Sequence, residues 1–207
     1  NLQKKNLMTK FSKIISSGSY LPDKILTNKE LENMVDTSDK WITERTGIKE
    51  RRVAAEDETS VDLAYKASID AIKKSNIDKN EIGAIFLATC TPERKFPSTA
   101  VLLQNRLDIK NAFSFDINAA CTGFVYALDI AKKYIESGQI KYALVVGTEK
   151  ITSLLDWSDR NTCVLFGDGS GAMILCSSNE PGILSSTIGS DGSFKDLLTV
   201  NTDLEYI

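Results

Sequence analysis

The fold of this chain is decided by the stretch Phe113-Ser-Phe-Asp-Ile-Asn-Ala-Ala-Cys-Thr-Gly-Phe-Val-Tyr-Ala-Leu128. Up to Ile117, apolar residues alternate with small or polar ones, which is the period of a β-strand. From Cys121 onward, apolar residues recur at steps of three and four, which is the period of an α-helix. The junction holds Ala119, Ala120 and Gly123, whose small size suits a tight turn and a close backbone approach. The stretch therefore predicts a strand, a tight turn and a helix that begins at Cys121.

This prediction places the Cys121 thiol on the first turn of a helix. There it faces unpaired backbone N–H groups and the positive end of the helix dipole. Both stabilise a thiolate and lower a thiol pKa from its free value of about 8.5. Such a thiolate favours nucleophilic attack on a carbonyl and formation of a covalent acyl intermediate. Because the chain contains no histidine, any step that needs an imidazole must take it from elsewhere or proceed without it.

Composition predicts a soluble globular protein. The 207 residues are 42% hydrophobic and 26% charged, with a net charge of −3, which gives no general attraction to nucleic acid or membranes. No apolar run approaches the roughly 18 residues that span a bilayer. Residues 1–10 are polar and lack the apolar core of a secretion signal, so we expect a disordered extension or an added remnant there.

The four cysteines indicate a reducing compartment. They show no C-x-x-C spacing and have no histidine beside them, which argues against a metal site. They are also sparse for a disulfide framework, so we expect a cytoplasmic protein. Cys163 and Cys176 lie in apolar runs and are predicted to be small buried hydrophobic residues. Cys90 follows a predicted strand and either packs or lines a site.

Period and capping residues predict the remaining elements, with a capping box at Thr59 and Asp62 and a helix stop at Gly47. Strands are expected at residues 11–20, 84–89, 113–117, 142–146, 171–177 and 183–188, and helices at 29–35, 39–46, 60–75, 98–107 and from Cys121 to Glu136. Such alternation predicts an α/β fold, with a mostly parallel sheet that is buried on both sides between helices. No linker divides residues 11–207, which we expect to form one domain.

One glycine-rich segment, Phe166-Gly-Asp-Gly-Ser-Gly-Ala172, matches the G-x-G-x-x-A spacing of a dinucleotide-binding turn. That fingerprint follows a strand and opens a helix, whereas this segment leads into a predicted strand. We therefore interpret it as a glycine turn that lets the backbone pass close to the Cys121 junction, and we expect no nucleotide cofactor.

Several segments together resemble one protein family. Asp116-Ile-Asn-Ala-Ala-Cys-Thr-Gly-Phe124 resembles the active-site elbow of β-ketoacyl-acyl-carrier-protein synthase III, a condensing enzyme with the thiolase-like fold. Further segments resemble that family in its order along the chain: Gly18-Ser-Tyr-Leu-Pro22, residues 35–48, Phe96-Pro-Ser98, residues 141–147 and Phe166-Gly-Asp-Gly169. The resemblance covers about residues 11–198 and implies the N-terminal, βαβαβ-type half of the thiolase-like fold, with the C-terminal half missing.

The resemblance also implies roles for single residues. Cys121 resembles the nucleophile that takes an acyl group from coenzyme A, and its own backbone N–H resembles one oxyanion-hole donor. Trp41 and Arg160 resemble the pair whose planes sandwich the adenine of coenzyme A. Arg45 resembles a residue that faces the nucleotide phosphates. Phe96 resembles an aromatic residue that closes the acyl pocket of the neighbouring subunit.

The reaction implied by the resemblance begins fatty-acid biosynthesis. An acyl group passes from acetyl-CoA or another short acyl-CoA to Cys121, and decarboxylative condensation with malonyl-acyl-carrier-protein follows. Coenzyme A enters as a thioester substrate, no cofactor or metal is implied, and the partner subunit is a second copy in a homodimer.

Condensation in this family uses a histidine and an asparagine from the second half of the fold, and we expect this chain to lack both. Three explanations stay open: a fragment of a complete synthase, one subunit of a split condensing enzyme, or a non-catalytic module that binds coenzyme A or a partner.

Overall fold

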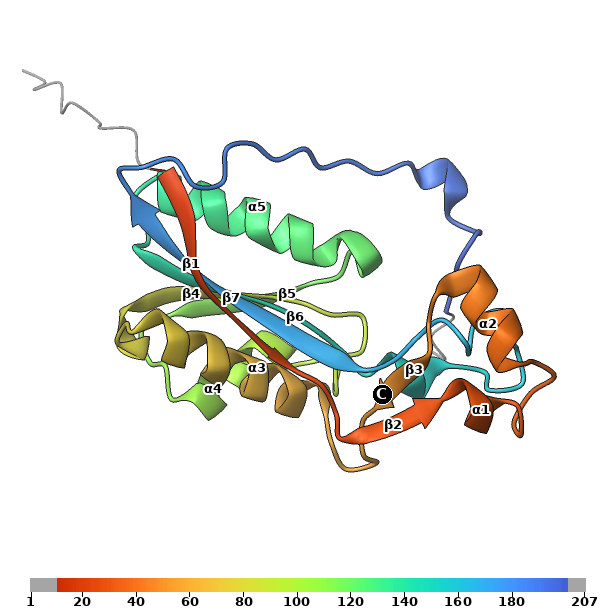
Figure 1. Ribbon diagram of the computed structural model, residues 1–207. Helices are drawn as coiled ribbons and strands as arrows, with labels where there is room; N and C mark the ends of the chain where they lie inside the picture. The colour runs from red at the N-terminus through yellow and green to blue at the C-terminus, as the bar shows by residue number, and fades with distance from the viewer. Residues whose placement is uncertain (1–10, 201–207) are drawn as a thin grey trace, which may run out of the picture.

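The computed structural model describes residues 11–200 and forms a layered α/β structure (Figure 1). The expected disordered extension at residues 1–10 lies outside the described residues. A central five-stranded sheet lies between α5 on one face and α3 with α4 on the other, and a smaller two-stranded sheet extends from one end.

The elements follow one another in the order expected of alternating strands and helices. The strands are β1 Phe11–Tyr20, β2 Lys24–Thr27, β3 Glu50–Val53, β4 Ile82–Ala88, β5 Phe113–Ile117, β6 Tyr142–Glu149 and β7 Gly169–Ser178. The α-helices are α1 Asn28–Leu31, α2 Asp39–Thr46, α3 Ser60–Ser75, α4 Thr99–Leu107 and α5 Gly123–Glu136. Short 3₁₀ helices are η1 Lys79–Glu81, η2 Ala120–Thr122, η3 Ile151–Leu154 and η4 Gly192–Phe194.

The central sheet has the strand order β1-β7-β6-β4-β5. Strands β4, β5 and β6 are parallel neighbours, whereas β7 is antiparallel to both β1 and β6. The predicted parallel pairing is therefore confirmed for β4, β5 and β6, whereas β1 and β7 pair antiparallel and make the sheet a mixed one. No α-helix connects β6 to β7, so the chain turns back beside β6 instead of crossing over a face of the sheet.

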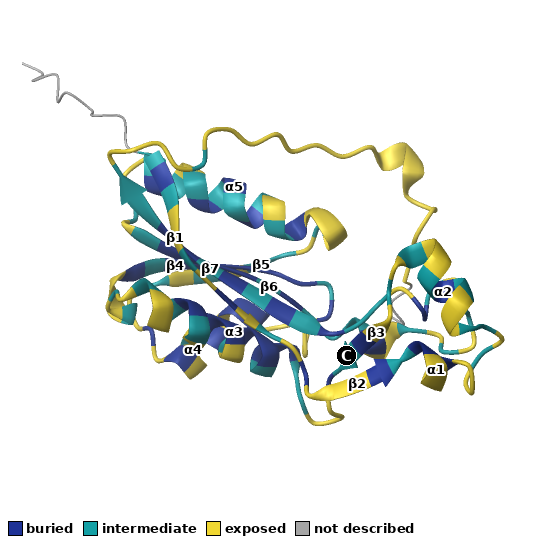
Figure 2. Cartoon of the chain, viewed as in Figure 1, coloured by how far each residue is buried: buried dark blue, intermediate teal, exposed yellow. Residues whose placement is uncertain are grey.

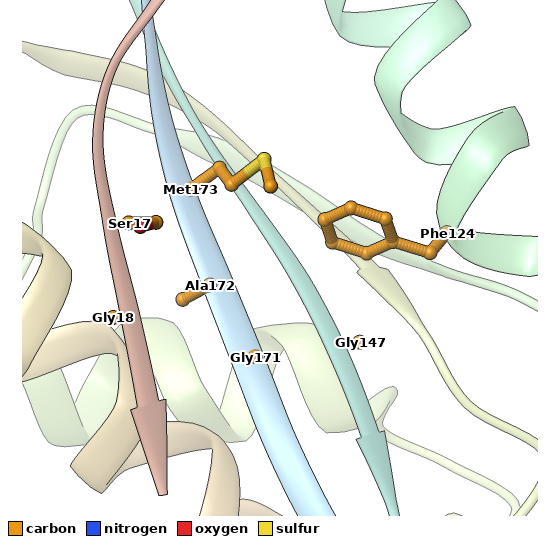
Figure 3. Close-up of a pocket in the computed structure, with 7 residues that line it drawn as sticks. All are labelled: Ser17, Gly18, Phe124, Gly147, Gly171, Ala172 and Met173. Atoms are coloured by element: carbon orange, nitrogen blue, oxygen red, sulfur yellow. The ribbon is translucent and has the colours of Figure 1, made fainter.

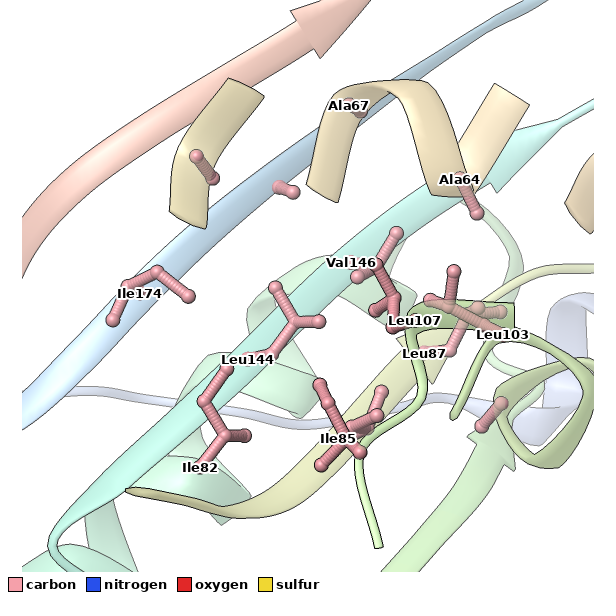
Figure 4. Close-up of a cluster of buried hydrophobic side chains, with 14 residues drawn as sticks. Ala64, Ala67, Ile82, Ile85, Leu87, Leu103, Leu107, Leu144, Val146 and Ile174 are labelled. Atoms are coloured by element: carbon pink, nitrogen blue, oxygen red, sulfur yellow. The ribbon is translucent and has the colours of Figure 1, made fainter. Parts of the chain in front are cut away.

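Each face of the sheet has its own apolar core, because successive side chains of a strand point to opposite faces. Ile85 and Leu87 of β4 pack toward α3 and α4 (Figure 4), whereas Ala84 and Phe86 pack toward α5. The strands between these helices are largely buried (Figure 2). Burial on both faces is confirmed for the central strands β4 and β6, whereas the edge strands β1 and β5 are partly exposed.

Helix ends follow the predicted capping residues closely. Thr59 and Asp62 form the predicted capping box of α3, and Gly47 ends α2 in the left-handed region with φ 74°. The predicted helix 29–35 is much shorter, because α1 ends at Leu31 and turns follow. Met34 in this stretch is 48% exposed, and a short helix without a packed apolar face gains too little to continue.

Two predictions about strands are wrong. Residues 183–188 form no strand: Ile183 N–H donates to the Ser12 carbonyl, and the segment then runs along α5, held by Ser186 and Tyr126 side chains (Figure 1). Conversely, β2 and β3 were not expected. They are four residues each and pair only with one another, too short for a recognisable alternating pattern.

Candidate active site

Cys121 lies between β5 and α5, in the 3₁₀ turn η2. The predicted helix start is wrong by two residues, because α5 begins at Gly123. Ala120 has φ 44°, in the left-handed region, and this residue interrupts a regular helix before Cys121. Thr122 closes the turn by donating its backbone N–H and its hydroxyl to the Ala119 carbonyl, at 3.1 and 2.8 Å. The thiol of Cys121 is exposed.

The predicted close approach occurs at Gly123. A Cβ atom there would lie 3.1 Å from the Ala88 Cβ at the end of β4. Thr89 N–H donates to the Ile117 carbonyl at 3.2 Å, which joins the ends of β4 and β5. The helix after Cys121 therefore begins directly over the carboxyl ends of two parallel strands, where ligands commonly bind in open α/β sheets.

A second cysteine, Cys90, follows β4 at the same edge of the sheet. Its backbone N–H donates to the Glu149 carboxylate at 2.8 Å, and the Thr91 hydroxyl donates to the same group at 2.6 Å. Burial, and secondarily the Glu149 charge, raise the pKa of the half-buried Cys90 thiol to about 11. Cys90 is therefore held as a neutral thiol, while Cys121 is the thiol open to reagents.

The loop that carries Phe96 is fixed at both ends. At its start, Glu149 holds Cys90 and Thr91. At its end, the Asp116 carboxylate accepts the N–H groups of Thr99 and Ala100 at 2.7 Å each, at the N-terminus of α4. Between these anchors residues 92–97 are exposed, and Phe96 has 71% of its surface exposed. The ring is thus presented to solvent on a loop with fixed ends.

The three residues predicted to bind coenzyme A lie together. The Arg45 and Arg160 guanidinium carbons lie 4.5 and 4.8 Å from the centre of the Trp41 ring system. Arg160 also donates to the Asp36 carbonyl at 2.9 Å. A base stacked between two planes needs about twice the separation of a single stacked pair. An adenine between Trp41 and Arg160 therefore requires Arg160 to move away from the indole.

The glycine-rich segment at residues 166–172 leads into β7, as predicted, and its two ends have different neighbours. A Cβ on Gly167 would lie 2.9 Å from the Arg51 Cβ of β3, so the start of the segment packs against β3, whereas Gly171 lines a pocket with Phe124 of α5. The segment's Asp168 carboxylate accepts bonds from Ala54 N–H and from the N–H and hydroxyl of Thr152. These bonds fasten β3 to the segment after β6.

An open pocket of about 310 Å³ lies beside the first turn of α5, and the sequence predictions missed it (Figure 3). Phe124 lies over the glycines of β6 and β7, with the Met173 side chain beside it (Figure 3). The pocket is lined by Ser17, Gly18, Phe124, Gly147, Gly171, Ala172 and Met173. Recurring small residues in β1, β6 and β7 are the signal that could have indicated it.

Two classes of feature are absent from residues 11–200. They contain no group of three or more histidine, cysteine, aspartate or glutamate side chains placed to hold a metal ion. In the same range, no helix has the length and apolarity needed to cross a membrane.

Solved structures of known proteins share this fold. The crystal structure of 3-oxoacyl-[acyl-carrier-protein] synthase III from Aquifex aeolicus superposes with a TM-score of 0.80 at 53% identity, covering 82% of this chain and 55% of that one. The synthase III structure from Pseudomonas aeruginosa superposes with a TM-score of 0.88 at 38% identity, covering 93% of this chain and 61% of that one. The chain therefore has the thiolase-like α/β fold.

Sequence comparison relates the chain to one family of proteins with the thiolase-like fold. Residues 115–192 match the family described as 3-oxoacyl-[acyl-carrier-protein (ACP)] synthase III. The chain is 51% identical over 191 residues to beta-ketoacyl-[acyl-carrier-protein] synthase III of Alkalilimnicola ehrlichii, which covers 92% of this chain and 59% of that protein. The chain is therefore similar to 3-oxoacyl-[acyl-carrier-protein] synthase III proteins, as its segments predicted, and spans about three fifths of the length of such relatives.

Proposed function

We propose that this chain carries the acyl-accepting part of a β-ketoacyl-acyl-carrier-protein synthase III. Cys121 takes a short acyl group, acetyl in the first instance, from a coenzyme A thioester. The observation that carries the proposal is the exposed Cys121 thiol in the turn before α5. A reactive thiol needs access, and the backbone N–H groups of a neighbouring helix N-terminus favour the oxyanion of the thioester.

The coenzyme A site in this proposal consists of Trp41, Arg45 and Arg160. Trp41 offers a flat face to adenine and both arginines already lie within 5 Å of its ring centre. In the bound state, Arg160 leaves the indole and stacks on the other face of the base, while Arg45 holds phosphate oxygens. Coenzyme A is the substrate carrier, and the proposal requires no further cofactor.

Condensation with malonyl-acyl-carrier-protein is the second step of the proposed reaction. The family resemblance assigns its electrophilic contacts to a histidine and an asparagine. Since the chain has no histidine, that imidazole must come from residues outside these 207. The chain alone is therefore proposed to load Cys121 and to release no carbon dioxide from malonyl-acyl-carrier-protein.

A homodimer in the cytoplasm completes the proposal. Strand β5 is at one end of the sheet order, and exposed Phe113 and Phe115 side chains lie on it. An edge strand of this kind favours pairing with a second copy. Phe96, on its fixed loop, is proposed to reach the partner's acyl pocket. All four cysteines are free thiols, which suits a reducing compartment.

Acyl transfer to Cys121 is testable with radiolabelled acetyl-CoA. The unsubstituted chain should retain label after denaturation. The Cys121→Ser variant should retain less than about a tenth of that label, because a serine hydroxyl is a far weaker nucleophile at neutral pH. The control variant Cys90→Ser should retain the label fully. Undiminished label on Cys121→Ser would overturn the assignment. A chain that binds coenzyme A but takes no label would instead support the non-catalytic module.

A further inference from the structure

Arg51 of β3 is a buried cation whose partners are all neutral. Its side chain is 5% exposed. Nη1 donates to the Leu26 carbonyl at 3.1 Å, and Nη2 donates to the Asn28 side-chain oxygen at 2.9 Å and to the Val164 carbonyl at 3.1 Å. Burial lowers the pKa of the guanidinium from its ordinary value. Burying a charge without a carboxylate partner costs free energy. We therefore ask what the three hydrogen bonds of Arg51 hold in place.

Asn28 extends this connection to α2, the helix that carries Trp41. The Asn28 amide is 1% exposed and donates to the Asp39 carboxylate at 2.8 Å and to the Ile48 carbonyl at 2.7 Å. Asp39 is the first residue of α2, and Ile48 follows its C-terminal glycine. Asn28, which accepts a hydrogen bond from Arg51, therefore holds both ends of α2.

Val164 connects Arg51 to the segment that carries Arg160. Cys163 N–H donates to the Asp159 carbonyl at 3.0 Å, and Leu165 N–H donates to the Thr162 carbonyl at 3.0 Å, so residues 159–165 form consecutive turns. Val164 and Cys163 are buried in a small core that Trp41 also packs against. The guanidinium thus joins two segments that are more than a hundred residues apart in sequence.

From these contacts we infer that Arg51 is a positioning residue of the coenzyme A site. It fixes the distance between the helix that presents Trp41 and the turns that present Arg160, without touching the nucleotide. Beyond the shared core, the two segments are joined near the ligand by the stacking of Arg160 on Trp41 and by the hydrogen bond and ion pair of Arg160 with Asp36. A base that enters between Trp41 and Arg160 breaks their stacking. The spacing of the two segments must then be held by contacts outside the ligand site, and the hydrogen bonds of Arg51 provide such contacts.

The inference rests on the proposed function and predicts a selective defect. In Arg51→Lys, the lysine keeps the positive charge but cannot reach three divergent acceptors from one nitrogen. We expect KM for acetyl-CoA in the loading of Cys121 to rise about tenfold, since one or two hydrogen bonds to a charged donor are lost. The loading rate at saturation, and the KM for acetyl-pantetheine, which lacks the nucleotide, should change less than about twofold.

Arg52→Lys is the matched control, because Arg52 is the next residue of β3 and donates to the Pro22 carbonyl at 3.0 Å, outside this network. It should leave both KM values unchanged. Equal KM values for acetyl-CoA in Arg51→Lys and Arg52→Lys would overturn the inference. So would an equal rise of the KM values for acetyl-CoA and acetyl-pantetheine in Arg51→Lys, because that result indicates a general loss of structure and not a defect at the nucleotide. An unsubstituted chain that takes no label from either thioester would count against the proposed function instead.

A measurement on the unsubstituted protein covers the case in which Arg51→Lys does not fold. Hydrogen exchange should show the amides of α2 and of residues 162–165 opening together, with the same free energy, because one buried side chain joins them. Independent opening of the two segments would contradict the inference.

Discussion

At the scale of single residues, the four thiols differ in exposure and in charge environment. Cys121 is exposed in a turn, whereas Cys163 is fully buried in the small core beside α2, as predicted. Cys176 is only half-buried, which corrects its predicted full burial. Burial is the main cause that raises the pKa of Cys90, Cys163 and Cys176 above the ordinary value of a thiol. Exposure therefore favours reaction at Cys121, and the raised pKa values of the other three thiols disfavour reaction at those positions.

Alkylation with dilute iodoacetamide should modify Cys121 before the other cysteines. At pH 8 a thiol whose pKa is about 11 is ionised to roughly one part in a thousand, so Cys90 should react at least about tenfold more slowly. Peptide mass spectrometry over a time course measures each site. Labelling of Cys90 at the rate of Cys121 would show that the Glu149 environment does not protect it.

At the scale of elements, the packing of α3 against β1 depends on one glycine. A Cβ on Gly18 would lie 2.3 Å from both the Ala67 carbonyl oxygen and the Ala71 nitrogen, which are backbone atoms of α3. Backbone atoms of a helix cannot move aside as a flexible side chain can. The close contact of this helix with the sheet therefore requires glycine at position 18.

Gly18→Ala should destabilise the fold by about 1–3 kcal/mol, the range for overpacking a close contact. Gly171→Ala is the matched control on the neighbouring strand β7, because nothing lies within 4 Å of a Cβ at that position. Urea denaturation compares their free energies of unfolding. Equal stability of the two variants would mean that α3 can move away from β1 without loss.

The N-terminus of α3 carries a pH-dependent contribution to stability through Asp62. Partial burial alone would raise the pKa of this carboxyl, but hydrogen bonds from Thr59 and the pairing with Arg106 outweigh it and lower the pKa to about 2. Because the folded-state pKa is below the ordinary value of 3.8, the contribution is complete above about pH 4 and is lost as the pH falls toward 2.

Asp62→Ala should lower the free energy of unfolding at pH 7 by about 1–2 kcal/mol, the cost of losing a cap. Its stability should also fall less steeply than that of the unsubstituted chain between about pH 4 and pH 2. Chemical denaturation at a series of pH values measures both effects. Asp70→Ala, on the exposed face of the same helix, should change stability much less; a parallel pH profile for Asp62→Ala would contradict the role of its carboxylate.

At the scale of the whole molecule, two surfaces favour association. Strand β5 ends the sheet and exposes Phe113 at 40% and Phe115 at 36%. On the α5 face, Val125 is 47% exposed while Phe124, Tyr126 and Leu128 are half-buried. Apolar residues at a free sheet edge and beside an open pocket both favour burial against another protein surface.

Sedimentation velocity should show the chain as an oligomer, and Phe113→Lys should weaken its self-association about tenfold or more by placing a charge on the β5 edge. Val125→Lys serves as the comparison on the α5 face. A shift toward monomer in Val125→Lys alone would assign association to that face, and a monodisperse monomer of the unsubstituted chain would contradict the proposed homodimer.

The sequence by itself determined many of the local elements and marked the junction at Cys121. Alternation predicted β5, Gly47 predicted the end of α2, the capping box at Thr59 and Asp62 predicted the start of α3, and small residues marked the junction at Cys121. These features depend on neighbours within a few residues, so a linear pattern contains them.

Tertiary structure alone decided the reversed direction of β7, the pairing of the short strands β2 and β3, and the contact of Arg160 with Trp41. It also decided that Arg51 joins the two segments of that site. Each of these depends on groups far apart in sequence, whose meeting is set by the packing of the whole sheet and its helices and leaves no local periodic signal.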